Sequence, residues 1–383
     1  MADTAAPAPV APRERILALD VLRGFAMFGV LVAYCMWSLG TAPEDRWSAL
    51  DRAIAEATAF AVDGKFYTIL AFLFGVGFSI QLQRAADSSD AVRLIARRLT
   101  VLAAIGLVHA LLLRNGDILL PYAVTGFLLI PFRRSSGPVL LAAAIIALFI
   151  PDVARALWEA SGAPIPERPA LENQPYLVEN LAWVRYWYQT AIFTWPANLT
   201  LFLLGYYAGS RAILAKLGAE PRKLAAILIC GVAAGAALYF LRLALIETGR
   251  SSPVEKAALG LMFDLHCWSI GSAYVAALLL ALKSRRGEAL LSPLAAIGRL
   301  ALTNYVMQAG LIVPLCLLLG WFDNFTPSTS LALALAVFVL VQLPFSLWWL
   351  RRYQFGPAEW IWRRFTYSRV PPLKLADRGS AGI

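Results

Sequence analysis

Long apolar blocks alternate with short polar breaks along almost the whole chain. Each block is roughly 17–25 residues long, the length at which an α-helix crosses the hydrocarbon core of a bilayer. The pattern therefore predicts an all-α, polytopic transmembrane bundle within residues 16–350. About ten transmembrane helices are expected, at 16–39, 58–83, 94–113, 117–132, 138–158, 186–209, 224–246, 258–282, 292–320 and 329–350.

Both ends of the chain and its longest loop differ from these blocks. Residues 1–15 are rich in alanine and proline and predict a disordered cytoplasmic N-terminus. Residues 351–383 mix aromatic and basic residues, which predicts a cytoplasmic tail at the membrane interface. The proline-rich segment 159–184 predicts an external loop with irregular or short interfacial structure.

Composition and charge support a membrane protein and exclude a nucleic-acid binder. Hydrophobic residues make up 60% of the chain, above the roughly 45–50% of soluble domains. The net charge is +10, but the basic residues flank the apolar blocks instead of forming a separate patch. We therefore expect membrane lipids as partners and no nucleic acid, while nothing in the sequence indicates an oligomeric state.

The distribution of charge between loops predicts the orientation. Acidic residues dominate the first, the longest and the next intervening loops, with Glu44, Asp45, Asp51, Glu159, Glu167, Glu172, Glu179, Glu247 and Glu255. The alternate loops and the tail are basic and include Arg13, Arg15, Arg84, Arg93, Arg97, Arg98, Arg133, Arg134, Arg211, Lys216, Arg222, Lys223, Lys283, Arg285, Arg286, Arg351 and Arg352. Because basic loops remain in the cytoplasm, both termini are predicted there, which agrees with an even number of crossings.

Ionisable and amide side chains inside the apolar blocks are candidate functional residues, because burying them in lipid is costly. The predicted orientation sorts them into two layers. The outer layer contains Asp63, Lys65, His109, Arg114, Asp117, Arg242, Asp264 and His266. The inner layer contains Asp20, Arg23, Arg299, Thr303, Asn304 and Gln308.

Several of these residues also have a purely structural interpretation. Asp20 and Arg23 share a helical face, where they would neutralise one another. Arg114 and Asp117 flank an Asn-Gly turn and would then form an interfacial loop, and His266 lies near a helix start, where polar groups are tolerated. Alternatively, each of them contributes to a site.

His109 is the strongest candidate for proton transfer. It lies inside the apolar run GLVHALLL, with no polar neighbour on its own helix before Arg114. Its partner must therefore come from another helix or from water. An ordinary histidine pKa of about 6.5 allows proton transfer at physiological pH, although a buried histidine that only forms hydrogen bonds is the alternative.

Two further patterns bear on function. The segments FLFGVGFSIQLQR and LFLLGYYAGSRA are weakly similar, which indicates either a parallel internal repeat or glycine-mediated helix packing. The motifs typical of nucleotide, zinc or α/β-hydrolase sites are absent from the sequence. We therefore predict no metal and no bound cofactor.

Five segments together resemble the YeiB-like family of bacterial inner-membrane proteins, a domain of unknown function. They run from the first helix to the tail: LDVLRGFAMFGVLV (19–32), DGKFYTILAFLFGVGF (63–78), RRLTVLAAIGLVHALLLRNGDILLPYA (97–123), GRLALTNYVMQA (298–309) and FGPAEWIWRRFTY (355–367). The resemblance implies a multi-pass protein of the bacterial inner (plasma) membrane. Its first helices are similar to those of transmembrane acyltransferases such as heparan-alpha-glucosaminide N-acetyltransferase.

That similarity implies transfer of an acyl group from cytoplasmic acyl-CoA to an acceptor at the outer, periplasmic face. In the glucosaminide enzyme a catalytic histidine follows the first helix, whereas residues 40–57 here contain no histidine. Either His109, on a different helix, takes an analogous place, or this chain is a relative that lost or never had the chemistry. Acyl-CoA would be a co-substrate. The candidate catalytic residues are His109, Asp117, Asp264 and His266, and the candidate substrate-binding residues are Lys65, Asp63, Arg114, Arg242, Asp20, Arg23, Arg299, Asn304 and Gln308.

These residues divide the proposed chemistry between the two faces. His109 would act as general base, with Asp117 or Asp264 orienting it and Lys65 or Arg114 stabilising developing charge. Arg23, Arg299 and the loop arginines would hold CoA phosphates. The alternative is a small-molecule transporter with Asn304 and Gln308 along its pathway, or a non-catalytic membrane component.

Overall fold

The computed structural model describes residues 17–39, 41–84, 89–113, 116–164, 166–169, 175–249, 252–367 and 372–374. The predicted N-terminal segment 1–15, parts of the 159–184 loop and most of the chain after residue 367 lie outside these residues. The described chain is all-α apart from two isolated bridges, Thr41 with Phe325 and Tyr353 with Lys374.

The helices follow one another in short succession. Their bounds are α1 (Leu17–Ser38), α2 (Ala49–Ala61), α3 (Lys65–Arg84), α4 (Ser89–Leu112), α5 (Leu119–Leu129), α6 (Gly137–Ala160), α7 (Tyr176–Gln189), α8 (Trp195–Ser210), α9 (Ile213–Gly218), α10 (Pro221–Glu247), α11 (Pro253–Ala281), α12 (Arg285–Arg299), α13 (Ala301–Leu319), α14 (Pro327–Ala336), α15 (Leu343–Leu350) and α16 (Pro357–Thr366). A π-helical turn, Val337–Gln342, joins α14 to α15.

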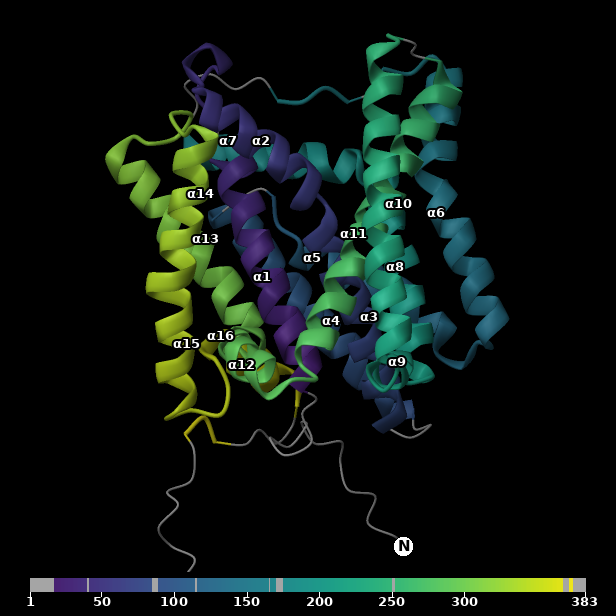
Figure 1. Ribbon diagram of the computed structural model, residues 1–383, viewed down its shortest axis with the longest axis vertical. Coiled ribbons are helices and arrows are strands. Elements are labelled where there is room, and N and C mark those ends of the chain that lie inside the picture. The colour runs from purple at the N-terminus through teal and green to yellow at the C-terminus, as the bar shows by residue number, and fades with distance from the viewer. Residues whose placement is uncertain are drawn as a thin grey trace, which may run out of the picture.

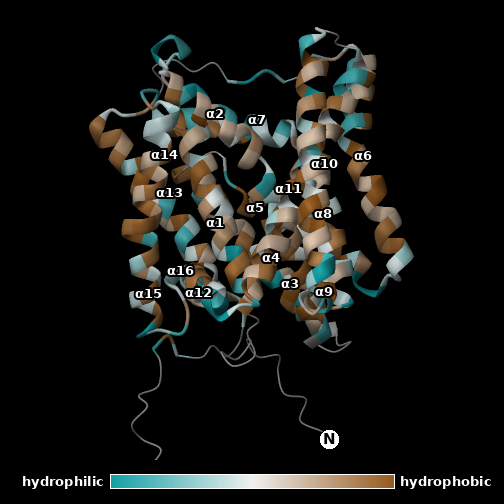
Figure 2. Ribbon diagram, viewed as in Figure 1, coloured by the Kyte–Doolittle hydropathy of each residue, from teal (hydrophilic) through white to brown (hydrophobic). Residues whose placement is uncertain are grey.

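Eight segments of the described chain are long and apolar enough to cross a membrane: α1, α2 with α3, α4, α6, α10, α11, α13, and α14 with α15. Large apolar side chains point outward from them, among them Ile146 on α6, Ile229 on α10 and Leu340 in the π-helical turn. Figure 2 shows mostly hydrophobic residues along α6 and α10 between more polar ends. An outward-facing apolar surface of this kind is stable in lipid and not in water.

Two of the expected crossings are shorter than the blocks that predicted them. The 117–132 block forms α5 and a 3-10 turn, Ile130–Arg134, because Pro131 interrupts regular α-helical hydrogen bonding. The 186–209 block begins within α7 and continues as α8 after a break at residues 190–194. Pro196 occupies the first turn of α8, where its missing N–H has no helical partner to lose.

Two other predicted helices are divided. The 58–83 block contains the end of α2 and most of α3, which are separated at Gly64, a residue with a φ of +79° that suits glycine. A reciprocal cap between Ser48 and Asp51 starts α2 well before the predicted position. The 292–320 block is divided at Leu300, between α12 and α13.

Viewed from the side, the bundle has two unlike edges (Figure 1). Helices α2 and α7 run across the upper edge, and α9, α12 and α16 lie at the lower edge, where α1 begins and α15 ends. Helix α7 covers the last nine residues of the 159–184 segment and continues five residues beyond it. The main apolar core joins α1, α3, α13 and α14 and includes Leu31, Leu73, Ile312 and Ala334.

Two glycines allow helices α3 and α8 to approach backbone to backbone. A Cβ on Gly75 of α3 would lie 2.2 Å from the carbonyl oxygen of Phe202 on α8, and a Cβ on Gly205 of α8 would lie 2.0 Å from that of Phe72 on α3. The two similar segments noted in the sequence are thus the two sides of one contact. Glycine-mediated packing explains their similarity without an internal repeat.

The tail motif closes the break between α12 and α13. Glu359 on α16 accepts hydrogen bonds from the backbone N–H groups of Leu302 (2.7 Å) and Thr303 (3.1 Å) and from the Thr303 hydroxyl (2.5 Å). Helix N-termini carry unpaired N–H groups, which this carboxylate satisfies. Burial raises the pKa of Glu359, while these hydrogen bonds act in the opposite direction. The GRLALTNY and FGPAEW segments therefore meet in space.

Replacing Glu359 by alanine is expected to lower the free energy of unfolding by about 1–3 kcal/mol, because two buried N–H groups lose their acceptor. Glu359→Gln keeps one acceptor oxygen and should cost less. Thermal unfolding of the two purified variants in detergent checks the order. Equal melting temperatures for wild type and Glu359→Ala would show that the contact does not stabilise the fold.

Candidate functional site

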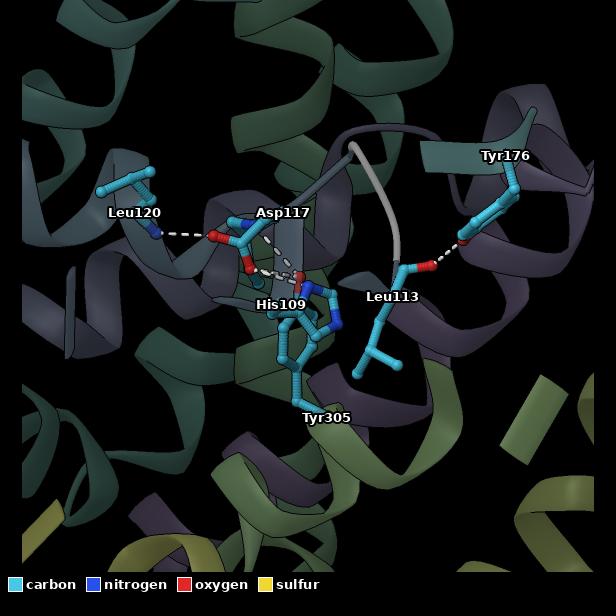
Figure 3. A network of polar contacts seen from close by, with 7 residues as sticks. His109, Leu113, Asp117, Leu120, Tyr176 and Tyr305 are labelled. Carbon is cyan, nitrogen blue, oxygen red and sulfur yellow. Dashed lines mark hydrogen bonds and ion pairs between the residues drawn. The ribbon is translucent and has the colours of Figure 1, made fainter. Parts of the chain in front are cut away.

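The one buried cluster that joins a histidine to a carboxylate lies near the start of α5 in the described chain (Figure 3). Nδ1 of His109 lies 3.1 Å from Oδ1 of Asp117. The Tyr305 hydroxyl donates to the same carboxylate oxygen at 3.1 Å, and the backbone N–H of Leu120 donates to Oδ2 at 2.7 Å. Residues from α4, the α4–α5 connection and α13 thus converge on Asp117.

Local structure fixes this geometry. A Cβ on Gly106 would lie 2.5 Å from the Leu120 nitrogen and 2.7 Å from Asp117 Oδ2, so glycine allows the start of α5 to lie against α4. The backbone N–H of Ile118 donates to the Tyr305 hydroxyl at 3.0 Å. Asp117 lies in the connection between α4 and α5, but its side chain belongs to the packed interior.

The cluster is shielded from solvent. The His109 side chain is 3% exposed and the Asp117 side chain 2% exposed. The Tyr305 ring stacks on the imidazole with centroids 4.7 Å apart. His109 Nδ1 is close enough to Asp117 for an ion pair but poorly aligned for a hydrogen bond, and Nε2 has no partner within the described chain. A buried, unpaired ring nitrogen is available for proton transfer if the ring stack opens.

A cavity of about 830 Å³ opens on the α7 side of this cluster. Asp117 contributes to its wall, and helices α7 and α8 provide much of its aromatic surface. Its lining residues include Trp37, Tyr67, Tyr122, Tyr176, Glu179, Trp183, Trp187, Tyr188, Trp195, Phe322 and Asp323. We refer to it as the outer cavity.

A second cavity, of about 410 Å³, lies toward the α12 and α16 side, and we refer to it as the inner cavity. Four arginines line it, namely Arg23, Arg98, Arg299 and Arg363, together with Asp20 and Glu359. Arg98 stacks over the Trp362 ring at 3.9 Å, and the Trp362 indole N–H donates to the Arg98 carbonyl at 2.9 Å. The tail helix thus forms part of a cationic wall.

The two cavities approach each other at the His109 cluster. Ile118 and Tyr122 line both of them. Asp117 lines the outer cavity, and Tyr305, which donates to Asp117, lines the inner one. This hydrogen-bonded pair lies between the two spaces together with Ile118 and Tyr122. His109 lines neither cavity itself and packs against both members of the pair.

Four other outer-layer candidates, namely Lys65, Arg242, Asp264 and His266, gather elsewhere and line neither cavity. Lys65 is fully buried and donates to the Ala59 carbonyl at 2.8 Å, and Arg242 donates to that of Leu259 at 3.1 Å. Nδ1 of His266 lies 2.9 Å from the Gly235 carbonyl oxygen. These contacts, together with Asp264 on α11, belong to the packing of α2, α3, α10 and α11.

Asp63 connects that region to the outer cavity. Its carboxylate accepts a hydrogen bond from the Trp37 indole at 2.8 Å, and Trp37 is a lining residue of the cavity. Arg114 lies outside the described residues. The outer-layer candidates are therefore divided between the His109 cluster and a separate region near α11.

The inner-layer candidates divide in a similar way. Asp20 and Arg23 form the expected ion pair at 3.3 Å and line the inner cavity with Arg299. Asn304 and Gln308 line neither cavity. The Asn304 side chain donates to Ser346 at 3.0 Å, and Gln342 donates to Gln308 at 3.5 Å, so both amides join α13 to the helix formed by α14 and α15.

Sequence reasoning missed two groups of residues in the site. Tyr305 lies six positions after Arg299 within ALTNY, but a tyrosine in an apolar helix gives no signal by itself. Tyr176, Glu179 and Trp183 have a helical spacing within the 159–184 segment, where a loop was expected, and Trp187 continues it at the start of the block expected as a helix, 186–209. Their shared face is the α7 wall of the outer cavity.

Comparison with known proteins places the chain in a family. Residues 208–369 match the family described as "Protein of unknown function (DUF418)". The "Uncharacterized 39.9 kDa protein in amylase 3'region" of Bacillus acidopullulyticus is 33% identical over 96% of this chain and 98% of its own length.

Two other relatives match over nearly their whole length. "Uncharacterized protein YxaH" of Bacillus subtilis is 29% identical over 95% of this chain and 97% of its own length. "Uncharacterized protein YeiB" of Escherichia coli K12 is 26% identical over 94% of this chain and 98% of its own length. The YeiB-like resemblance predicted from the five segments is confirmed, and the chain belongs to the DUF418 family of multi-pass membrane proteins.

Proposed function

We propose that the protein is a transmembrane acyltransferase, which moves an acyl group from cytoplasmic acyl-CoA to an acceptor at the outer face of the bacterial inner membrane. The observation that carries the proposal is the meeting of the two cavities at Asp117 and Tyr305, beside a buried histidine. A reaction between compounds on opposite faces requires such a meeting point within the bilayer.

The proposal includes ten crossings with both termini in the cytoplasm. To the eight long spans it adds α5 and α8, which lie within the bundle in Figure 1. The basic connections before α6, α10 and α12 then lie on one side, at the edge where α1 begins. This places the inner cavity toward the cytoplasm and α7 at the outer surface.

The inner cavity has the charge expected for an acyl-CoA site. Its four arginines exceed its two acidic residues, and guanidinium groups suit phosphate oxygens. Arg98 lies eleven residues before His109 on α4, a separation of about 16 Å along the helix axis. An extended thioester arm anchored at the arginines would therefore point toward Tyr305.

The cluster provides a general base once the ring stack opens. We propose that movement of Tyr305 exposes His109 Nε2, which removes a proton from the acceptor hydroxyl or amine. The acceptor oxygen or nitrogen forms a bond to the acyl carbon, and the carbon–sulfur bond of the thioester breaks. The proton passes from His109 to the departing CoA thiolate, while Asp117 stabilises the imidazolium ion.

Acetyl-CoA at saturating concentration should raise the melting temperature of the purified protein. A ligand at 100 times its Kd stabilises the folded state by about 2.7 kcal/mol. Arg23→Gln should reduce the shift, whereas Arg352→Gln, a change at an exposed tail arginine outside the inner cavity, should leave it unchanged. Absence of any shift with wild-type protein would contradict the proposed donor site.

A further inference from the structure

The outer cavity has an aromatic wall that bears a free carboxylate. Glu179, Trp183 and Trp187 follow one another at four-residue intervals on α7, which places them on one helical face. Trp183 and Trp187 stack with ring centroids 6.1 Å apart, and Tyr188 and Trp195 meet edge to face at 5.4 Å. Both aromatic pairs line the same cavity.

The charged groups of this wall all have one sign. Glu179, Asp323 and Asp117 line the cavity, and within the described chain no lysine or arginine does. Glu179 and Asp323 have no ion-pair or side-chain hydrogen-bond partner among the described residues. Trp187 is 37% exposed and Tyr188 is 41% exposed, so the aromatic faces are open to a ligand.

We infer that the outer cavity binds an organic cation, a protonated amine or a quaternary ammonium group. Aromatic faces attract cations through the negative face of the ring, and most strongly when the ring is an indole. Unpaired carboxylates add a Coulombic attraction that a neutral ligand does not share. The inference deepens the proposed function, on which it rests for the statement that the bound cation is the acyl acceptor. A quaternary ammonium compound would accept the acyl group on a hydroxyl, as choline could. A protonated amine would first release one proton to water, and the neutral amine would then react as described above.

Cation recognition distinguishes this cavity from a general aromatic site. A neutral sugar would also stack on indole rings and form hydrogen bonds with carboxylates. Its affinity, however, would not be increased by the net negative charge of the cavity. The same wall repels anions, so a free phosphate or carboxylate ligand is disfavoured. Charge dependence of binding is therefore the property to measure.

Choline and 3,3-dimethylbutan-1-ol provide the matched probes, because they have nearly the same shape and only choline is charged. Calorimetric titration of the purified full-length protein, without any acyl donor, should show choline binding at least about tenfold more tightly than the neutral alcohol. Equal affinities, or no binding of choline, would overturn the inference. Tighter binding of a neutral glucoside than of choline would also overturn the inference.

Variants locate the binding to the wall. Glu179→Gln and Trp187→Leu should each weaken choline binding by about fivefold or more. The controls are Glu247→Gln and Trp348→Leu, which change an exposed acid and an exposed indole outside both cavities. Unchanged affinity in both wall variants would overturn the assignment, and Glu179→Gln remains informative if Trp187→Leu does not fold.

The titration is independent of catalysis. Choline binding with no stabilisation by acetyl-CoA would support the cation site and contradict the proposed acyltransferase function. The opposite result is stabilisation by acetyl-CoA with no preference for choline over the neutral alcohol. It would support the acyl-CoA site and contradict a cationic acceptor in the outer cavity.

Discussion

Replacing His109 by alanine is expected to lower the rate of acyl transfer by about 10²–10⁴-fold, the usual contribution of a general base. The change removes the imidazole ring that lies against Asp117 and stacks on Tyr305. Release of the CoA thiol from acetyl-CoA by membranes containing the protein measures the rate. A wild-type rate in the variant would remove His109 from the mechanism.

Two companion variants separate a role in chemistry from a role in folding. Asp117→Asn keeps the shape of the side chain but removes the charge that would stabilise an imidazolium ion, so it should also reduce the rate strongly. His266→Ala tests the second histidine, which contacts the Gly235 carbonyl and lines neither cavity. We expect at least a tenfold larger loss from His109→Ala than from His266→Ala, and melting temperatures of both proteins report on folding.

Replacing Gly205 by alanine is expected to destabilise the fold by about 1–3 kcal/mol or more. The new Cβ would lie 2.0 Å from the Phe72 carbonyl oxygen, a backbone atom that cannot move aside like a flexible side chain. Helices α3 and α8 would have to separate. Because α3 and α8 both contribute to the cavity walls, the substitution should also weaken ligand binding.

Gly310→Ala is the matched control for this prediction. Gly310 lies within α13, and a Cβ there would meet nothing within 4 Å. Alanine favours a helix over glycine by about 1 kcal/mol, so the control should be neutral or stabilising. Thermal or denaturant unfolding in detergent compares the two, and a Gly205→Ala protein as stable as Gly310→Ala would contradict the close contact.

The sequence predicted the elements whose signals are long and periodic. Apolar length was sufficient to locate α6, α10 and α11 to within about five residues, because so long an apolar run is typical of a helix that crosses a membrane. It was not sufficient at Leu300, where the helix is divided because Glu359, more than fifty residues later, caps the new N-terminus. Such a break depends on a distant contact that periodicity does not reveal.

The contact between two site residues could be predicted from their depth in the membrane. His109 and Asp117 were expected at the same level, and they contact each other. Depth does not specify the position around the bundle axis. Lys65 and His266 were therefore assigned to the same layer as His109, although their hydrogen-bond partners, Ala59 and Gly235, lie in another part of the bundle. Tyr305 was missed because a tyrosine shows its role only through the partners it contacts.

Sidedness of transfer tests the central proposal most directly. Inside-out membrane vesicles would receive acetyl-labelled acetyl-CoA in the medium, which contacts the cytoplasmic face. We expect label to accumulate in a product inside the vesicles that contain wild-type protein, and not in those that contain His109→Ala. Label that remains outside, or equal accumulation with both proteins, would contradict transfer through the His109 cluster.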